Sequence, residues 1–392
     1  MTPAARYAAA IDVLDRTTNG QSSEKAIMAW GRSNRYAGSK DRAAVRDHVY
    51  DILRQKRSLA HLGGGFTARA LVIGLLRLQG INPNHIFGSG GYSPDALTLE
   101  EAELTVDAMP EPVRMDLPDW LWPIWTADLG DAADSSAHCL QSRAPIALRI
   151  NSRRGSLSYV QAELGQEGIE TQTIDAVPTA LLVTQNARRL RHSKAFIKGL
   201  FDLQDISSQN AVASLSVRKG ARVLDYCAGG GGKALAIADM HDAIVTAHDI
   251  APERTIDIAP RAARADVKIN LVLSHDLILH APFDLVFCDA PCSGSGTWRR
   301  TPEAKWALTI NKLNKFSLLQ SDVIKKAASY VAADGKLVYA TCSVLRAENN
   351  DVIDAFLADY PDWVCERVSQ QLPSEISDGF FFAILRRAQI NL

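Results

Sequence analysis

The spacing of apolar residues changes along this chain of 392 residues. Up to about residue 80, apolar positions recur at helical intervals, as in the stripe formed by Tyr7, Ile11 and Leu14, with glycines as breaks. An acidic, proline-rich stretch with three tryptophans follows and is expected to be a connector with short helices. The pattern therefore predicts a helical first part that ends near Cys139.

From about residue 144 the apolar residues fall into short runs that are typical of strands. Residues 146–150 and 180–184 predict two strands, and residues 157–164 between them predict a helix. This indicates a small α+β module of about 60 residues, too small to bury a core far from a neighbour.

Beyond about residue 206, apolar runs alternate with helix-length segments, which predicts a doubly wound parallel sheet. The five runs are residues 223–226, 244–248, 269–273, 285–289 and 337–341. We therefore expect a multidomain chain with a helical domain at 1–140, a small α+β module at 141–205 and an α/β domain at 206–392.

Charge is distributed unevenly although the formal net charge is only -1. Residues 1–80 carry 13 basic against 6 acidic side chains, residues 81–136 carry 1 against 11, and residues 141–200 carry 9 against 4. Such asymmetry favours a polyanionic partner, nucleic acid above all, although solvated helix faces produce the same counts. With 22% charged and 47% hydrophobic residues, wholesale disorder is excluded.

The sequence predicts no membrane span, no secretory signal and no zinc site. No apolar run approaches the roughly 20 residues that span a bilayer. A secretory signal needs an uninterrupted apolar segment, and acidic residues interrupt the apolar residues at the start of this chain. The six cysteines show no CxxC pair and no zinc-ligand spacing. We therefore expect a cytoplasmic protein that uses neither a membrane nor a metal.

The first chemical motif is VLDYCAGGGGKA at residues 223–234, a predicted strand that runs into four glycines and then a helix. Glycines at such a turn let the backbone approach a ligand. Gly229, Gly231 and Ala234 also match the dinucleotide fingerprint G-x-G-x-x-A, so a nicotinamide dehydrogenase is one alternative. Asp249 ends the next predicted strand, where a carboxylate accepts ribose hydroxyls. A nucleoside cofactor is expected, and this pattern alone does not identify it.

Two further motifs follow later strands of the same predicted sheet. FDLVFCDAPCSGSGTWRRTPEAKW at residues 283–306 contains Asp289, Cys292, Arg299 and Arg300, and GKLVYATCSVLRAENN at residues 335–350 contains Cys342. Open α/β sheets bind ligands at the carboxyl ends of their strands. We therefore expect a carboxylate, two thiols and two guanidinium groups at one edge of the sheet.

These three segments resemble the signature motifs of the Fmu/Sun family of RNA cytosine-5 methyltransferases. The family motifs read D-x-C-A-A-P-G-G-K-T, then D-A-P-C-S-G followed by R-R-x-P-[DE]-x-K-W, and Y-A-T-C-S-[VL]. The segments GLFDLQDISSQ and APIALRIN are similar to family segments before the catalytic domain, and SKDRAAVRDHVYDILRQKRSL is similar to the NusB-like domain of the bacterial 16S rRNA branch. The resemblance implies an all-α NusB-like RNA-binding domain, a small α+β RNA-binding module and a Rossmann-like methyltransferase domain.

Site roles follow from the resemblance, residue by residue. It implies that Cys342 attacks carbon 6 of cytosine, that Asp289 contacts the pyrimidine, that Cys292 serves release of the product and that Lys233 completes the catalytic set. It also implies S-adenosyl-L-methionine as cofactor. The residues expected to hold the cofactor are Cys227, Ala228, Gly229, Gly230, Gly231, Gly232, Lys233, Asp249, Asp276 and Asp289.

The expected partner is RNA, with 16S rRNA first and tRNA as the alternative, and the protein is expected to be a monomer. Gly229, Gly230 and Ala234 replace the family's Ala, Pro and Thr, which bears on the affinity for S-adenosylmethionine. A catalytically weak rRNA-binding assembly factor therefore remains a further alternative. The arginines expected to contact RNA phosphates are Arg149, Arg153, Arg154, Arg188, Arg189, Arg191, Arg299 and Arg300.

Overall fold

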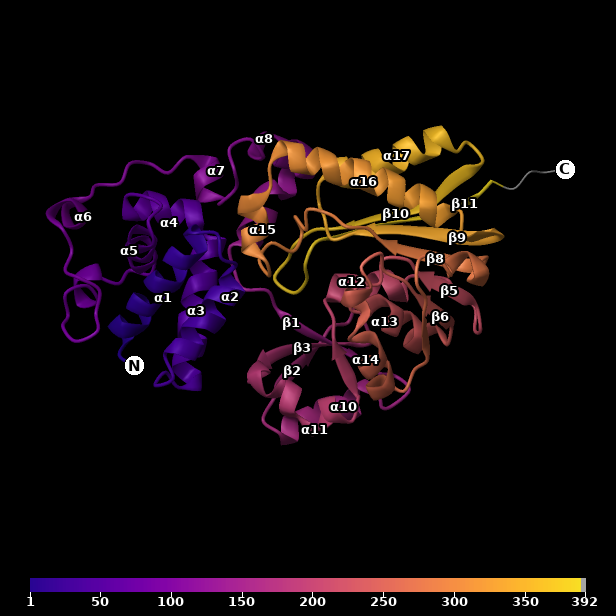
Figure 1. The fold of residues 1–392 in the computed structure, drawn as a ribbon, viewed down its shortest axis with the longest axis horizontal. Helices are drawn as coiled ribbons and strands as arrows, with labels where there is room; N and C mark the ends of the chain where they lie inside the picture. The colour runs from indigo at the N-terminus through magenta and orange to yellow at the C-terminus, as the bar shows by residue number, and fades with distance from the viewer. Residues whose placement is uncertain (389–392) are drawn as a thin grey trace. The chain divides into compact units, whose positions relative to one another are not determined.

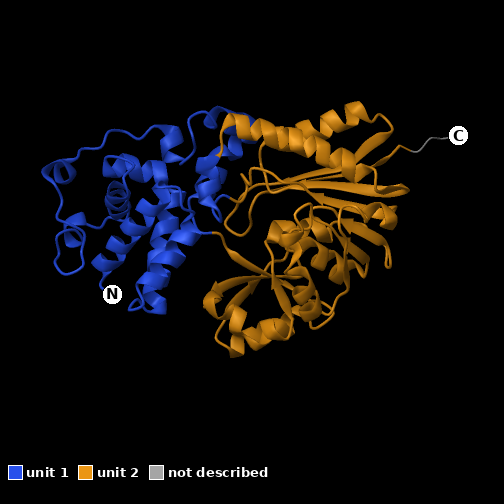
Figure 2. Cartoon of the chain, viewed as in Figure 1, with its two compact units in different colours: residues 1–143, 298–307 blue, residues 144–297, 308–392 orange. Residues whose placement is uncertain are grey.

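The computed structural model describes residues 1–388 and divides the chain into two compact units (Figure 2). Unit 1 holds Met1–Arg143 together with Trp298–Ala307, and unit 2 holds Ala144–Thr297 together with the chain from Leu308. The prediction differs from this division: it separated the small module at 141–205 from the domain at 206–392, whereas both lie in unit 2, and it ended the helical domain at residue 140. Residues 298–307, expected in the methyltransferase domain, belong by their contacts to the helical unit.

Unit 1 is all-helical. Its core lies between α1, α3 and α5, where Val13, Val45 and Val72 are fully buried. A Cβ on Gly74 would lie 2.0 Å from the carbonyl oxygen of Leu59, so only glycine permits the close approach of α4 and α5. The helices are α1 (Pro3–Thr18), α2 (Ser23–Ser33), α3 (Ser39–Arg54), α4 (Lys56–Gly63), α5 (Ala68–Leu78), α6 (Leu99–Glu103), α7 (Glu111–Arg114), α8 (Trp122–Leu129), α9 (Ala133–Leu140) and α15 (Pro302–Ala307).

The length and apolar content of each helix bear on whether it could cross a membrane. Among residues 1–388, no single helix has both the length and the apolar character needed to cross a bilayer. Within the described part of the chain, one pair of helices, α4 and α5, passes on length and composition when taken together, and the two helices are bent by 91° relative to each other.

Unit 2 begins with a small antiparallel sheet of strand order β2-β3-β1-β4. Val160 and Leu164 of its longer helix are buried with Leu148, Leu181 and Phe201 in one apolar cluster. Two of its strands escaped prediction, because β2 is polar and β4 has only three residues. The elements are β1 (Ile146–Ile150), α10 (Leu157–Gln166), β2 (Glu170–Thr173), β3 (Ala180–Gln185), α11 (Lys194–Ile197) and β4 (Phe201–Leu203).

The rest of unit 2 is built on a seven-stranded sheet of order β10-β11-β9-β8-β5-β6-β7, in which β5 to β9 run parallel. The predicted doubly wound parallel sheet is thus confirmed, with an antiparallel pair at one edge. The strands are β5 (Arg222–Asp225), β6 (Ile244–Ala247), β7 (Ile269–Leu271), β8 (Phe283–Asp289), β9 (Val331–Thr341), β10 (Trp363–Gln371) and β11 (Phe380–Arg387).

Helices cover both faces of this sheet, as Figure 1 shows. Apolar side chains of α12, α13 and α14 join the buried cluster on one face, and those of α16 and α17 join the cluster on the other. Burial on both faces explains why the strands read as continuous apolar runs in the sequence. The helices are α12 (Ile206–Ala213), α13 (Gly232–His241), α14 (Ile258–Ala265), α16 (Ile310–Ala328) and α17 (Asn350–Asp359).

The strand order brings three chemical motifs to one edge. β8 lies between β5 and β9, and Asp289 of β8 pairs with Ala340 of β9. Cys342 therefore follows two residues beyond that pair. The loop after β5 starts at the same edge, since all three strands are parallel.

Candidate active site

Two thiols meet beyond the carboxyl ends of β8 and β9. The Sγ atoms of Cys292 and Cys342 lie 3.4 Å apart, within hydrogen-bonding distance for sulfur. The hydroxyl of Thr297 also donates to the Cys342 sulfur, over 3.8 Å. Adjacent parallel strands thus place both predicted cysteines in one cluster, although 50 residues separate them in the chain.

The pKa values of the two thiols are shifted in opposite directions by their surroundings. The hydrogen bond from Cys292 lowers the pKa of Cys342, and the Thr297 hydroxyl and the charge of Lys233 act in the same direction. The same contact and burial raise the pKa of Cys292 well above its usual value. Because the thiolate is the nucleophilic form of cysteine, Cys342 is the better nucleophile and Cys292 the proton-holding partner.

An ion pair stands beside the thiols. Lys233, near the start of α13, contacts Oδ2 of Asp289 through its Nζ at 2.5 Å, and its Nζ also lies 5.2 Å from the centre of the Phe380 ring. Burial by itself would lower the pKa of Lys233, but the charge of Asp289 outweighs it and the pKa is raised. Lys233 therefore stays cationic, holds the Asp289 carboxylate in place and favours the Cys342 thiolate.

A fully buried carboxylate, Glu348, joins the two cysteine loops. It accepts hydrogen bonds from the Ser293 amide at 2.7 Å, from the Ser343 hydroxyl at 2.6 Å and from Gln320 at 3.1 Å, and the Ser293 hydroxyl donates to it as well. Ser293 follows Cys292, and Ser343 follows Cys342. Sequence reasoning missed Glu348, because an acid in the polar run after Cys342 carries no distinguishing signal.

The glycine-rich loop after β5 has a shape that larger residues would not permit. Gly229 and Gly231 adopt φ angles of +49° and +77°, and a Cβ on Gly231 would lie 2.7 Å from Ile258. The buried Asp249 carboxylate accepts the Gly229 amide at 2.9 Å and the Ala251 amide at 3.0 Å. The predicted ribose-binding acid thus also fixes the loop.

A pocket of about 280 Å³ opens beside Asp249 at the ends of β6 and β7. One acid on mostly apolar walls suits an adenosine, whose ring is flat and whose ribose carries two hydroxyls. Asp276, the other acid expected here, lies half-buried beside His275 and is not among the lining residues. The lining residues are Ala247, Asp249, Pro252, Thr255, Leu271, Val272 and Leu273.

Asp225, the last residue of β5, adds a feature that fits a cationic ligand. Its side chain is almost wholly buried, and neither carboxylate oxygen makes a hydrogen bond of full geometry among residues 1–388, although the Ala234 amide is near enough to oppose the rise of its pKa. Burial raises its pKa to about 7, with the charge of Asp289 contributing. A buried carboxylate without a partner is costly unless a ligand supplies a donor. The ammonium group of S-adenosylmethionine is such a donor, so Asp225, Asp249 and the glycine loop fit this cofactor.

Binding of S-adenosylmethionine is expected to tighten about tenfold between pH 6 and pH 8, because Asp225 must lose its proton to accept from a cation. Calorimetry in two buffers of different ionisation enthalpy measures the affinity and the protons released. Asp225→Asn is expected to bind more weakly at pH 8 and to lose this pH dependence. Asp266→Asn, an exposed site, is the matched control. Equal pH dependence in Asp225→Asn would contradict the assignment.

The structure corrects two of the arginines expected to contact phosphates. Arg149 is 2% exposed and pairs with Asp239 at 2.5 Å, and Arg299 is 1% exposed inside unit 1. Neither guanidinium is accessible to a phosphate, because each one fills a buried position. The remaining candidates, all exposed, are Arg153, Arg154, Arg188, Arg189, Arg191 and Arg300.

Comparisons with known proteins identify the family of this chain. The family model described as 16S rRNA methyltransferase RsmB/F matches residues 212–386, and a model of the ferredoxin-like domain of the same proteins matches residues 117–188. Ribosomal RNA small subunit methyltransferase B of Xylella fastidiosa, strain Temecula1, is 34% identical over 291 residues, which cover 68% of this chain and 67% of the relative. The Proteus mirabilis protein of the same name is 31% identical, with 62% and 60% covered.

Solved structures show the same fold. The crystal structure of PH0851 matches with a TM-score of 0.79 and 21% identity, covering 99% of both chains. A methyltransferase homolog from Pyrococcus horikoshii matches with a TM-score of 0.62 and 23% identity, covering 71% of this chain and 98% of its own. The first of these matches includes the helical unit as well as the methyltransferase fold.

Proposed function

Since the chain belongs to the RsmB/F family of 16S rRNA methyltransferases, which use S-adenosylmethionine, we propose that it methylates carbon 5 of a cytosine in RNA through a covalent cysteine adduct. One observation carries the proposal. Cys292 and Cys342 lie 3.4 Å apart beside the Lys233–Asp289 ion pair, at the edge where the cofactor loop begins. A nicotinamide dehydrogenase would leave the two thiols without a function.

The chemistry needs each of these groups. Carbon 5 of cytosine is a weak nucleophile until a thiolate adds to carbon 6 and ring nitrogen 3 takes up a proton, which the Lys233 ammonium supplies through Asp289. Cys342, with its lowered pKa, supplies the thiolate, and Asp289 faces the ring nitrogen with its position set by Lys233. The cofactor supplies the methyl group. In the release step, which Cys292 serves, a base takes the proton from carbon 5, the double bond between carbons 5 and 6 re-forms, the Cys342 thiolate leaves, and ring nitrogen 3 returns its proton to the Lys233–Asp289 pair.

The proposed substrate is 16S rRNA at an unpaired or extruded cytosine, because the half-buried Cys342 thiol reaches carbon 6 only when the base leaves its stack. The curated relatives named above are ribosomal RNA small subunit methyltransferases, which supports rRNA over tRNA. The alignments span about two thirds of the length of those relatives, so the substrate stays part of the proposal.

Bisulfite sequencing of RNA from cells with and without the protein tests the reaction and the substrate together. We expect a cytosine of 16S rRNA to resist conversion only when the protein is present, and purified protein to restore that mark in vitro. A mark found in tRNA instead would move the substrate to tRNA. Binding of 16S rRNA without any mark would favour an assembly factor over an enzyme.

A further inference from the structure

Arg261, on α14, joins the glycine-rich loop after β5 to the small antiparallel sheet. Its Nη1 donates a hydrogen bond to the carbonyl oxygen of Gly230, the second glycine of the loop. Its Nη2 and Nε donate to Oδ2 of Asp202, in β4, at 2.6 Å and 3.2 Å. All three residues belong to unit 2. One guanidinium group therefore holds both a backbone atom of the loop and a carboxylate of the small sheet.

The carboxylate that anchors Arg261 is itself well fixed. The Asp202 side chain is only 12% exposed and that of Arg261 is 22% exposed. Arg264, three residues later on α14, donates to the other oxygen of Asp202 at 3.3 Å, and its guanidinium lies 4.1 Å from the centre of the Phe196 ring. Hydrogen bonds between two charged groups are stronger than those between neutral groups. Asp202 therefore keeps the Arg261 guanidinium in one orientation.

The loop that Arg261 contacts has little rigidity of its own. Residues 229–232 are four consecutive glycines, and glycine loses more conformational freedom on ordering than any other residue. The family motif that this loop resembles has a proline at the position of Gly230, and a proline would restrict the loop before any ligand binds. Contacts from outside the loop supply the restriction here. Asp249 holds the amide of Gly229, and Arg261 holds the carbonyl of Gly230.

The glycines also leave the space that α14 occupies beside the loop. A Cβ on Gly230 would lie 3.4 Å from Nη1 of Arg261, and a Cβ on Gly231 would lie 2.7 Å from the side chain of Ile258. Ile258 and Arg261 are three positions apart and so lie on the same side of α14. This side of the helix is therefore the surface against which the loop takes its shape.

We propose that Arg261 is a positioning residue for S-adenosylmethionine. By fixing the Gly230 carbonyl, it holds the loop in its binding shape before the cofactor arrives, so less ordering is required when the cofactor binds. Arg261 acts through the loop and not on the cofactor itself. This inference rests on the use of S-adenosylmethionine by the RsmB/F family and not on which base is methylated, so it can fail or hold independently of the proposed function.

The test compares Arg261→Gln with Arg264→Gln. Both variants remove a guanidinium from Asp202, and the two side chains are 22% and 23% exposed, but Arg261 is the one of the two that contacts the loop. By calorimetry we expect Arg261→Gln to bind S-adenosylmethionine about tenfold more weakly, because a hydrogen bond from a charged group that orders the loop is lost. Arg264→Gln is expected to bind the cofactor as the unmodified protein does.

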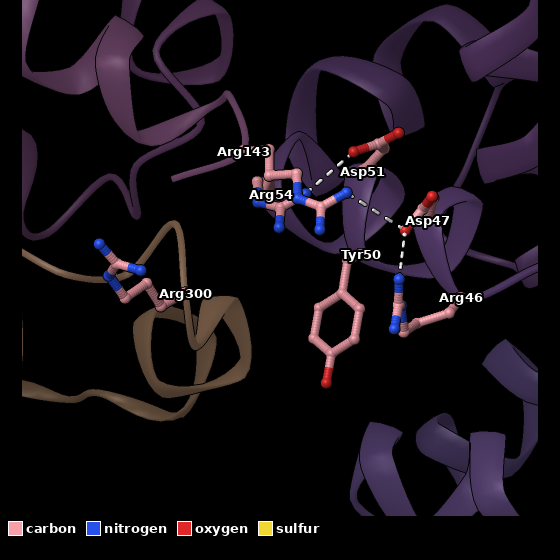
Figure 3. Close-up of a pocket in the computed structure, with 7 residues that line it drawn as sticks. All are labelled: Arg46, Asp47, Tyr50, Asp51, Arg54, Arg143 and Arg300. Carbon is pink, nitrogen blue, oxygen red and sulfur yellow. Dashed lines mark hydrogen bonds and ion pairs between the residues drawn. The ribbon is translucent and has the colours of Figure 1, made fainter. Parts of the chain in front are cut away.

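A second control removes an arginine–aspartate pair from unit 1. Arg143 pairs with Asp47 at 3.6 Å, and Figure 3 shows it beside a pocket of about 400 Å³ that Arg300 also lines. Arg143→Gln is expected to leave cofactor binding unchanged. A loss of cofactor affinity in Arg143→Gln would mean that removing any guanidinium of this kind weakens binding, which would overturn the assignment to Arg261.

Amide hydrogen exchange of the cofactor-free protein gives a readout that does not depend on catalysis. We expect the amides of residues 229–232 to exchange faster in Arg261→Gln than in Arg264→Gln, and saturating S-adenosylmethionine to remove most of the difference. Methyl transfer is expected to show a raised KM for the cofactor with little change in kcat. Arg261→Lys, whose single ammonium replaces a forked guanidinium, is expected to have an intermediate affinity.

Three results would overturn the inference. Equal cofactor affinity and equal loop exchange in Arg261→Gln and Arg264→Gln would mean that Arg261 only joins the two sheets of unit 2. Weaker binding with unchanged loop exchange would mean that Arg261 contacts the cofactor directly. If Arg261→Gln fails to fold, Asp202→Asn tests the same point, because it keeps Arg261 but weakens its anchor. Unchanged cofactor affinity in a folded Asp202→Asn variant would be the third contradicting result, and weaker binding with faster loop exchange would support the inference.

Discussion

Replacing Cys342 by alanine is expected to lower methyl transfer by at least about a thousandfold, because the remaining thiol, Cys292, has a raised pKa and is a poor nucleophile toward carbon 6. Binding of S-adenosylmethionine and of RNA is expected to persist, since Cys342 does not line the 280 Å³ pocket and the arginines expected to contact RNA phosphates lie outside the thiol cluster. Transfer of a labelled methyl group to RNA measures the loss. Activity retained by Cys342→Ala on its own substrate would remove this residue as nucleophile.

The partner substitution, Cys292→Ala, is expected to give a different result. Attack by Cys342 remains possible, but release fails, so a covalent protein–RNA adduct should accumulate and appear as a slower band in a denaturing gel. The double variant is expected to form no adduct. Cys365→Ala, in β10 and outside the cluster, is the matched control and should behave as the unmodified protein does.

A pH profile sharpens the division of roles between the two thiols. The hydrogen bond from Cys292 is the largest cause that lowers the pKa of Cys342. Without that bond the thiolate is less stabilised, so adduct formation by Cys292→Ala is expected to need a higher pH than attack by the unmodified protein. A profile that moves to lower pH would contradict the proposed direction of the hydrogen bond.

Replacing Glu348 by alanine is expected to destabilise unit 2 by about 3 kcal/mol or more, because donors from Ser293, Ser343 and Gln320 would lose their acceptor inside the protein. Methyl transfer should fall with stability, since both cysteine loops depend on this carboxylate. Glu348→Gln keeps the shape and one acceptor oxygen, so a smaller loss of about 1–2 kcal/mol is expected.

Chemical denaturation of unit 2 measures the stability change, with the exposed Glu375→Gln as control. At a temperature where Glu348→Gln remains folded, alkylation of Cys342 as a function of pH reports the geometry of the cluster. A variant of unchanged stability and unchanged thiol reactivity would mean that Glu348 only fills space between the loops.

Much of this architecture follows from local patterns. The five strands from β5 to β9 were predicted because burial on both faces leaves continuous apolar runs, and their parallel order follows from the helices between them. Parallel strands end at a common edge, so Asp289 and Cys342 could be placed together before any contact was known. Antiparallel β2 and β4 escaped prediction because they are short or polar.

The sequence by itself determined the family, the parallel sheet and the two thiols, because each of these leaves a pattern of residue types at fixed spacing. Only the tertiary structure decided the surroundings of charged side chains. Arg299 and Arg300 are identical neighbours in the chain, yet one is buried and the other lines an exposed pocket. Glu348 and Asp225 likewise carry no distinguishing signal in the sequence. In the structure both are buried, but Glu348 accepts hydrogen bonds from four donors, whereas Asp225 accepts none of full geometry among residues 1–388. A residue's type sets its possible contacts, but its partners depend on which distant segments fold against it.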